Sequence, residues 1–176
     1  DHRDESDYRK INILETGTAR GFSCLCMAKA LADANRAGTI VTIDVLPHNQ
    51  SIIWNCIDDL DGPSSRSDLL KRWQKLIQDH VIFVEGHTRS MVTRIYSQRI
   101  HYAFLDGSHE YDDIWFEFKQ VTKSQNIGDK IVFDDYTPAQ YQGLVKAADE
   151  VCEEYDYQKE VIRAGKNRGY LIAMKR

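Results

Sequence analysis

The feature that most constrains this sequence is an alternation between short apolar runs, each ending in an acidic residue, and longer segments with helical spacing. The apolar runs are residues 11–15, 39–44, 81–85, 102–106 and 130–134. Short, nearly continuous apolar runs are typical of parallel strands that are buried on both faces. Between them, apolar residues recur every three or four positions within residues 24–31, 69–77, 114–121 and 144–155. The alternation predicts an α/β fold, a doubly wound Rossmann-like sheet.

The end of the chain departs from this alternation. Residues 159–163 and 170–174 both have strand character, and only residues 164–169 lie between them. That connection is too short for a crossover helix and is rich in turn residues. We therefore expect an antiparallel hairpin at the end of the fold.

One long connection, residues 46–66, does not fit the regular plan. It contains prolines and glycine, and also Ile52, Ile53 and Trp54. A long connection with its own apolar residues is often a lid or a binding loop. These side chains could cover a substrate, or form a small hydrophobic cluster under a loop. We expect Ser67 to cap the helix that follows.

Length and composition limit the class of protein. The chain has 176 residues, which suits a single domain over 1–176, and 42% of them are hydrophobic. A net charge of −4 argues against nucleic acid or an anionic membrane as the main partner. The ten polar residues at the start predict no signal peptide. Because the sequence does not begin with Met, an N-terminal segment is expected to be missing.

The cysteines carry no metal-binding pattern. Cys24 and Cys26 lie two apart in a helical segment, so they point to different faces, and Cys56 and Cys152 stand alone. No second pair or nearby histidine completes a zinc site. The expectation is reduced thiols in a cytoplasmic protein.

The first candidate binding feature is the turn ETGTARG, residues 15–21, between the first strand and its helix. Gly17 and Gly21 permit a tight turn and a close approach of a ligand to the backbone. The three-glycine dinucleotide fingerprint and the P-loop pattern are both absent. Asp44 ends the second strand, beside this turn in such a sheet. A carboxylate at that place can accept hydrogen bonds from a ribose diol.

This glycine turn, followed by an acid after the second strand, resembles the class I S-adenosylmethionine-dependent methyltransferases over about residues 11–176. Ala19 stands where many members carry a glycine. The resemblance implies the sheet order 3-2-1-4-5-7-6 with strand seven antiparallel, in agreement with the terminal hairpin. It also implies a cofactor site made of Glu15, Gly17, Thr18, Gly21, Asp44, Gly86, His87, Thr88 and Asp106. His87 could equally be an exposed loop histidine.

Acidic residues also follow the fourth and fifth strands. In this topology the two strands are neighbours, so Asp106, Asp134 and Asp135 are expected to meet at one edge of the sheet. Three unpaired carboxylates repel one another, and a divalent cation resolves the conflict. Oxygen ligands favour Mg²⁺, with Ca²⁺ and Mn²⁺ also suited. The alternative is that Asp134 or Asp135 caps the next helix.

The pattern Asp–Gly–x–His–x–Tyr after one strand and Asp–Asp after the next resembles the metal-dependent O-methyltransferases. These include catechol, sugar and cephalosporin-related enzymes. The resemblance implies that Asp106, Asp134 and Asp135 hold the cation. It also places His109 where the catechol enzymes use a lysine as general base. An imidazole with a pKa near about 6.5 suits that role. The alternative is a histidine that only caps a helix or holds Asp106.

The predicted function is therefore metal-assisted O-methylation of a hydroxylated small molecule, with S-adenosylmethionine as methyl donor. A homo-oligomer is compatible with this prediction. The rival interpretations are a dinucleotide oxidoreductase of the NAD type, a repurposed relative such as a hydroxylase, and a non-catalytic S-adenosylmethionine-binding domain.

Overall fold

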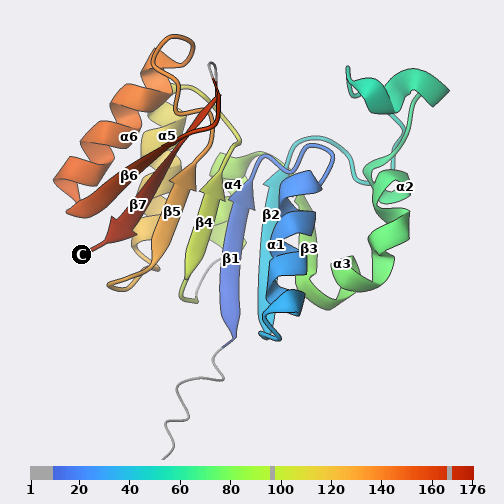
Figure 1. Ribbon diagram of the computed structural model, residues 1–176, viewed down its shortest axis with the longest axis horizontal. Helices are drawn as coiled ribbons and strands as arrows, with labels where there is room; N and C mark the ends of the chain where they lie inside the picture. The colour runs from blue at the N-terminus through green and yellow to red at the C-terminus, as the bar shows by residue number, and fades with distance from the viewer. Residues whose placement is uncertain (1–9, 96–97, 166–167) are drawn as a thin grey trace, which may run out of the picture.

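The fold is built on one seven-stranded sheet with the order β3-β2-β1-β4-β5-β7-β6 (Figure 1). The computed structural model describes residues 10–95, 98–165 and 168–176. Most of the predicted hairpin connection lies in this part of the chain, but residues 166 and 167 lie outside it. The strands are β1 Ile11–Thr16, β2 Gly38–Asp44, β3 Val81–Glu85, β4 Tyr102–Leu105, β5 Lys130–Phe133, β6 Tyr157–Arg163 and β7 Gly169–Lys175.

The strand pairing confirms the predicted sheet. Strands β1 to β5 pair in parallel, whereas β7 runs antiparallel to both β5 and β6. The register aligns the ends of three strands, because Thr16 pairs with Leu105 and Leu105 pairs with Phe133. Gly17, Asp106 and Asp134 each follow directly on those ends. The carboxyl edge of β1, β4 and β5 therefore carries both the glycine turn and the predicted acidic cluster.

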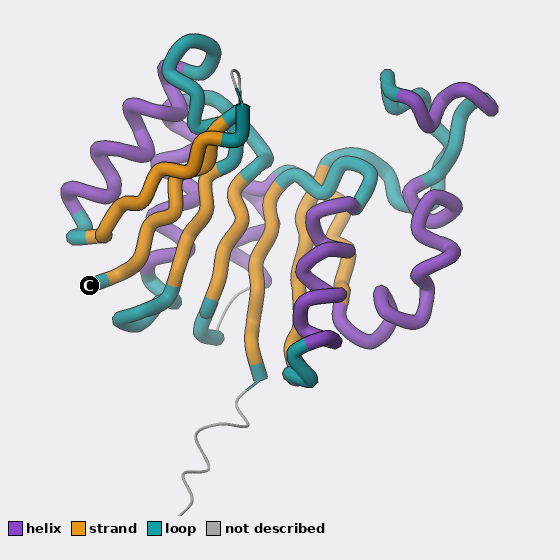
Figure 2. The backbone as a smooth tube through the Cα atoms, in the orientation of Figure 1, coloured by secondary structure: helices purple, strands orange, loops and turns teal. Residues whose placement is uncertain are grey.

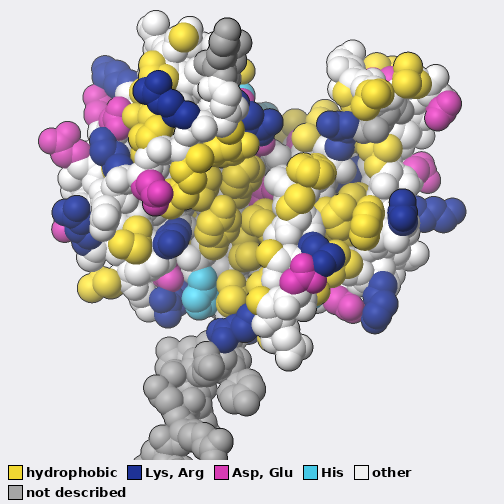
Figure 3. All heavy atoms as spheres, viewed as in Figure 1, with side chains coloured by type: hydrophobic (Ala, Val, Ile, Leu, Met, Phe, Trp, Pro, Cys, Tyr) yellow, Lys and Arg dark blue, Asp and Glu magenta, His cyan; other side chains and the backbone are white. Residues whose placement is uncertain are grey.

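Helices cover the two faces of the sheet unequally (Figures 1 and 2). In Figure 1, α1 lies in front of β2 and β3, while α4, α5 and α6 lie behind the sheet. No described helix covers the front of β4, β5 and β7, and hydrophobic side chains gather there in Figure 3. The helices are α1 Phe22–Asp33, α2 Arg66–Leu70, α3 Gln74–His80, α4 Thr88–Ile95, α5 Tyr111–Thr122 and α6 Gln142–Glu154.

The core lies between the sheet and its helices. Behind the sheet, Phe118 of α5 is fully buried against Phe133 of β5, with ring centroids 6.5 Å apart. In front, Cys24 and Leu31 of α1 pack with Ile40 of β2. Cys152 is also buried, and burial raises the pKa of its thiol to about 12. The predicted placement of Cys24 and Cys26 on different faces is confirmed, because Cys24 is buried and Cys26 is exposed, and no disulfide joins the four cysteines, all of which lie in the described part of the chain.

Two local predictions about helices are corrected. The cap of α2 is Ser65 rather than Ser67: its hydroxyl accepts the Asp68 N–H at 3.1 Å. The apolar stripe in 69–77 is divided between α2 and α3 by a 3₁₀ turn, Lys71–Trp73. In addition, the helix α4 has no counterpart among the predicted stripes.

The long connection after β2 forms an arm, residues 52–64, that stands away from the sheet at the upper right of Figures 1 and 2. Its base closes where Ile52 and Ser64 exchange backbone hydrogen bonds of 3.1 and 3.2 Å. Between them, Ile57 and Leu60 are exposed by 76% and 81%. In the described part of the chain, no helix has both the length and the apolar character needed to cross a membrane.

Candidate functional site

The glycine turn after β1 has a backbone that only glycine tolerates at two positions. Gly17 has φ +82°, and a Cβ there would lie 2.1 Å from the carbonyl oxygen of Asp106. Gly21 has φ +88°, and its Cβ would lie 2.8 Å from Cδ1 of Leu70. Ala19 also has a positive φ, +44°, at the position noted above for lacking glycine. The turn is therefore pressed directly against the end of β4.

Asp44 fixes this turn from the neighbouring strand. Its Oδ2 accepts the Ala19 N–H at 2.6 Å, and its Oδ1 accepts the Leu46 N–H at 2.9 Å. The Arg66 guanidinium lies 3.3 Å from Oδ2. A carboxylate has about four acceptor positions, so one remains on Oδ1.

Arg66 is a site residue that the sequence analysis misses. It is buried, its Nε donates to the Ala19 carbonyl at 2.5 Å, and its guanidinium lies over the rings of Trp54 and Phe83. It links the arm to the glycine turn. Sequence spacing offers no signal for this role, because a long connection separates Arg66 from its partners.

Glu15, the acidic residue that ends the first apolar run, is fully buried under the turn. It accepts a hydrogen bond from the Thr42 hydroxyl, and Thr42 in turn lies 2.5 Å from the hydroxyl of Thr18. Its Oε1 is buried without a hydrogen-bond partner in the part of the chain that the structure describes. Burial is the main cause that raises the Glu15 pKa to about 7.

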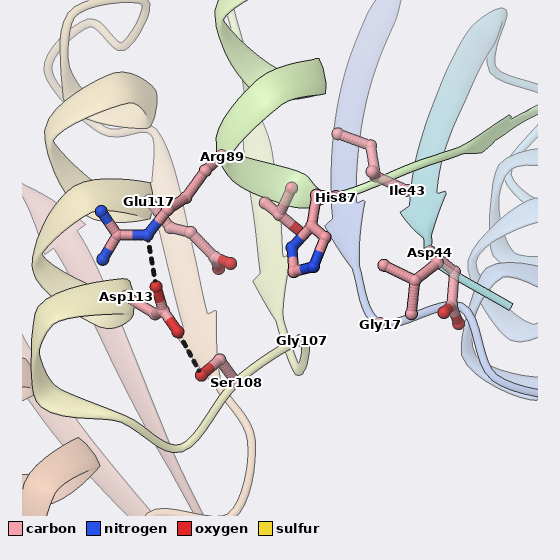
Figure 4. Close-up of a pocket in the computed structure, with 11 residues that line it drawn as sticks. Gly17, Ile43, Asp44, His87, Arg89, Gly107, Ser108, Asp113 and Glu117 are labelled. Atoms are coloured by element: carbon pink, nitrogen blue, oxygen red, sulfur yellow. Dashed lines mark hydrogen bonds and ion pairs between the residues drawn. The ribbon is translucent and has the colours of Figure 1, made fainter.

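Behind the turn lies a cavity of about 270 Å³ that we call the rear pocket (Figure 4). It contains several predicted cofactor residues, namely Gly17, Asp44, His87 and Thr88. Gly86 lies at its edge, where its N–H donates to the Asp44 carbonyl at 2.7 Å. The remaining walls are Ile43, Val45, Arg89, Gly107, Ser108, Asp113 and Glu117.

Glu117 of α5 is a second residue that the sequence analysis misses. It is buried, and in Figure 4 its carboxyl points into the rear pocket, opposite His87. Its Oε2 accepts the Thr16 hydroxyl at 2.9 Å. Burial is the main cause that raises its pKa to about 7. The sequence does contain one signal for Glu117. It is an acidic residue within the apolar stripe of this helix, three residues after Ile114 and one before Phe118.

In front of the turn lies a second cavity, about 410 Å³, that we call the front pocket. Gly17 lines both pockets, so the turn separates them. Asp106, Asp134 and Arg168 border the front pocket on one side. Its apolar walls are Phe22, Met27, Tyr102, Phe104 and Tyr170.

The structure brings three side chains into a compact group beside the front pocket. One ligand atom each from Asp106, His109 and Asp135 lies within 4.8 Å of the others. Asp135 has φ +52°, a strained conformation at the turn after β5. Burial, followed by the charges of Asp134 and Asp135, raises the Asp106 pKa to about 7. Such crowded acidity is the condition under which a cation binds favourably.

Asp134 lies at the same edge but has other partners. Its Oδ2 accepts a hydrogen bond from Arg168 at 2.8 Å, and its Oδ1 accepts the Asp135 N–H at 2.8 Å. It is buried, whereas Arg168 is 56% exposed. Asp134 therefore lies next to the group of three, and Arg168 of the terminal hairpin forms an ion pair with it.

His109 contacts this group through one nitrogen. Its Nε2 lies 3.1 Å from Oδ2 of Asp135. Its ring stacks on Tyr141 with centroids 4.0 Å apart and planes 16° from parallel. The stacking restricts the imidazole to one orientation, with Nε2 toward the acids.

A sheet of this order with a glycine turn and acids at its carboxyl edge defines a class I methyltransferase fold. Comparison with known proteins agrees: a profile described as "Methyltransferase domain", Methyltransf_24, matches residues 14–136, more than half of the chain. The chain belongs to this family of methyltransferase domains. The predicted resemblance to class I methyltransferases is thus confirmed. No curated protein sequence matches the chain.

Solved structures share the fold at low sequence identity. The O-methyltransferase NovP has 18% identity and a TM-score of 0.69, with 94% of this chain and 72% of NovP covered. An O-methyltransferase from Bacillus cereus, in complex with SAH, has 16% identity and a TM-score of 0.66, with 93% and 74% covered. TomG from Streptomyces achromogenes, in complex with SAM, has 20% identity and a TM-score of 0.65, with 93% and 73% covered.

Proposed function

We propose that this methyltransferase transfers a methyl group from S-adenosylmethionine to a hydroxyl group of a small molecule, with the assistance of a divalent cation. The observation that carries the proposal is the glycine turn between two pockets. Asp44 borders one pocket, and the acidic group with His109 borders the other. Two reactants can therefore meet at Gly17, and the family membership favours methyl transfer over the dinucleotide oxidoreductase considered above.

The residues around the turn fit S-adenosylmethionine. Gly17 leaves no room for a side chain between the pockets, and Asp44 keeps one acceptor position for a ribose hydroxyl. Glu15 holds a buried oxygen under the turn that finds no hydrogen-bond partner among the described residues. Glu15, Gly17, Thr18, Gly21 and Asp44 would hold the ribose and methionine parts. Gly86, His87 and Thr88 would contact the base, and Asp106 would lie beside the methionine part.

The acids fit a cation such as Mg²⁺ by their chemistry, since they are oxygen donors crowded at one edge. Asp106, Asp134 and Asp135 would hold it, and Arg168 would have to release Asp134 to do so. A bound cation would lower the pKa of a nearby hydroxyl and so make it a better nucleophile. His109 would take the proton: its ring stacks on Tyr141 with Nε2 toward this edge, and Nε2 would exchange its present contact with Asp135 for the acceptor hydroxyl.

The proposed reaction is a displacement in line. The acceptor hydroxyl gives its proton to His109, and its oxygen forms a bond to the methyl carbon. The carbon–sulfur bond breaks with its electron pair going to sulfur, so the positive sulfonium becomes the neutral thioether of S-adenosylhomocysteine. The chain contributes mainly by holding the two reactants in contact. The aromatic walls of the front pocket favour an acceptor with an apolar body.

The test has two arms. Isothermal titration with S-adenosylhomocysteine should show binding, and titration with NADH should show none. With a panel of catechols, phenols and sugar diols, methyl transfer should stop in excess EDTA and return with Mg²⁺. Full turnover in EDTA would contradict the role of the cation. A His109→Ala variant with unchanged kcat at neutral pH would remove His109 as the base.

A further inference from the structure

The structure assigns a role to Glu117 that depends on the proposed function: we propose that its free carboxyl oxygen accepts a hydrogen bond from the exocyclic amine of the adenine base, and so selects the base of the methyl donor. Glu117 lies in the middle of α5, outside the loops that carry the other predicted cofactor residues.

The base of the donor belongs in the rear pocket because of where the reaction must occur. The sulfonium has to face the front pocket, which Asp106 and Asp134 border. The ribose lies between sulfur and base, and Asp44 lines the rear pocket. The base must therefore extend behind the turn, between the apolar side chains of Ile43 and Val45 and the helices α4 and α5.

Most polar groups in the rear pocket already satisfy one another (Figure 4). Arg89 donates to Asp113 at 2.5 Å, and the Ser108 hydroxyl donates to the other Asp113 oxygen at 2.9 Å. Ser108 also accepts the Glu110 N–H at 3.2 Å. The hydrogen bonds within this group use most of its acceptors, so few remain for a ligand.

Glu117 differs from that set in one respect. Its Oε2 is held by the Thr16 hydroxyl, and among the described residues no hydrogen bond reaches its Oε1. The carboxyl is buried and points into the pocket. An oxygen of an ionised carboxylate that lines the cavity keeps lone pairs for a ligand N–H, and a charge-assisted hydrogen bond of this kind is strong. The N–H groups of an adenine edge are donors of the required kind.

Thr16 gives this acceptor a fixed position. It is the last residue of β1, directly before Gly17, and it anchors Oε2 while leaving Oε1 toward the cavity. Gly107, on the opposite wall, would place a Cβ 3.5 Å from Oε1, so its lack of a side chain keeps the approach open. In this proposal Oε1 of Glu117 recognises the base, and Thr16, the residue before Gly17, fixes its position.

The experiment compares S-adenosylhomocysteine with S-inosylhomocysteine, which carries an oxo group in place of the amine, by isothermal titration at about pH 8.5. There the Glu117 carboxyl is ionised and only accepts. The wild-type protein should bind the amino compound at least about tenfold more tightly, because the oxo group turns lone pairs toward the carboxylate and the one N–H left on that edge is displaced to N1. At about pH 6 the ratio should shrink, since a protonated carboxyl can donate to the oxo group.

The matched variant is Glu117→Gln, whose amide can present either a donor or an acceptor to the ligand. Its ratio should fall to about threefold or less, while Glu154→Gln, at the exposed end of α6, should keep the wild-type ratio. A purely structural Glu117 would weaken both ligands equally and leave the ratio unchanged.

Equal binding of both compounds by the wild-type protein would overturn the proposal without any variant. If the wild-type protein binds neither compound, the proposed function itself fails, and that outcome is distinct from a lost preference.

Discussion

The front and rear pockets share Gly17 but differ in how the charged side chains around them are paired. The rear pocket is lined by groups that neutralise one another, with Arg89, Ser108 and Asp113 in one closed set. The front pocket is bordered by Asp106 and Asp134, and Asp106 also forms a group with Asp135 and His109. Burial, followed by the charges of Asp134 and Asp135, raises the Asp106 pKa to about 7. A cavity whose charges are mostly paired, with acceptors left on Asp44 and Glu117, suits recognition of an uncharged base and its ribose, whereas crowded acids suit a cation and proton transfer.

The comparison shows how one sheet edge supports two kinds of chemistry. Gly17 is the only residue of the turn that lines both cavities, and it does so because its missing side chain lets β1 touch the end of β4. Changes at the turn should therefore damage both pockets together. Changes on either side should damage one pocket at a time.

The largest effect is expected from Gly17→Ala, which puts a methyl carbon 2.1 Å from the carbonyl oxygen of Asp106, far inside van der Waals contact, at a residue with φ +82°. The steric conflict and the strained conformation should together lower the free energy of unfolding by about 3–5 kcal/mol. Binding of S-adenosylhomocysteine should fall by about 100-fold or more. Thermal unfolding and calorimetric titration measure the two effects.

Gly128→Ala is the matched control for this change. Gly128 has φ +87°, yet a Cβ there meets no atom within 4 Å. It should lose only the cost of the left-handed conformation, about 1–2 kcal/mol, and keep ligand binding. Equal losses in both variants would mean that strain, rather than contact with β4, makes Gly17 necessary.

Two isosteric changes should separate the pockets. Asp135→Asn weakens the acidic group, so kcat should fall by about 100-fold while affinity for S-adenosylhomocysteine stays within about threefold. Asp44→Asn replaces a charged acceptor beside the ribose, so affinity should fall by about 10–100-fold. Initial rates and titrations on both proteins provide the comparison. If both variants lost affinity alike, the division between the pockets would not hold.

The strands and the terminal hairpin could be predicted because each depends on local pattern, whereas the strand order, and with it the acidic edge, came from the resemblance to a known family. Apolar runs identified the strands, and parallel pairing then brought Gly17, Asp106 and Asp134 to one edge. The two missed site residues depend on long-range contacts instead. Arg66 reaches the turn from the first residue of α2, just after the arm, and Glu117 reaches Thr16 across 101 residues of sequence.

Side-chain partners within the acidic edge were also beyond the sequence pattern. Spacing places Asp134 beside Asp135, but it does not reveal that Arg168 of the hairpin engages Asp134. Likewise, the stacking of His109 on Tyr141 depends on how α6 begins.

A smaller effect is expected on the pH dependence of stability, through Glu117. Its pKa rises from 4.5 to about 7 on folding. Between these values the folded state keeps a proton that the unfolded state has lost, so stability falls as pH rises through this window. The loss amounts to about 3 kcal/mol at most above pH 7. Glu117→Gln should remove it, so the variant should gain stability relative to wild type from pH 5 to pH 8.

Urea unfolding of the ligand-free protein at several pH values gives this difference directly. Glu15 has a similarly raised pKa but is present in both proteins, so it cancels in the comparison. Glu154→Gln should follow the wild-type curve, since this residue is exposed. A constant difference between wild type and Glu117→Gln across the window would show that the carboxyl is already ionised in the folded state.

The smallest effect should come from Tyr141, whose ring stacks on His109, the proposed general base. Stacking of this kind contributes about 0.5–1.5 kcal/mol, so Tyr141→Leu should lower kcat by about two- to tenfold through a less restricted His109. Tyr141→Phe keeps the ring and should keep the rate. Because Tyr141 is absent from the walls of both cavities, KM for S-adenosylmethionine should not change in either variant. Stopped-assay kinetics across pH check this, and a loss of rate in Tyr141→Phe would point to the hydroxyl instead of the stacked ring.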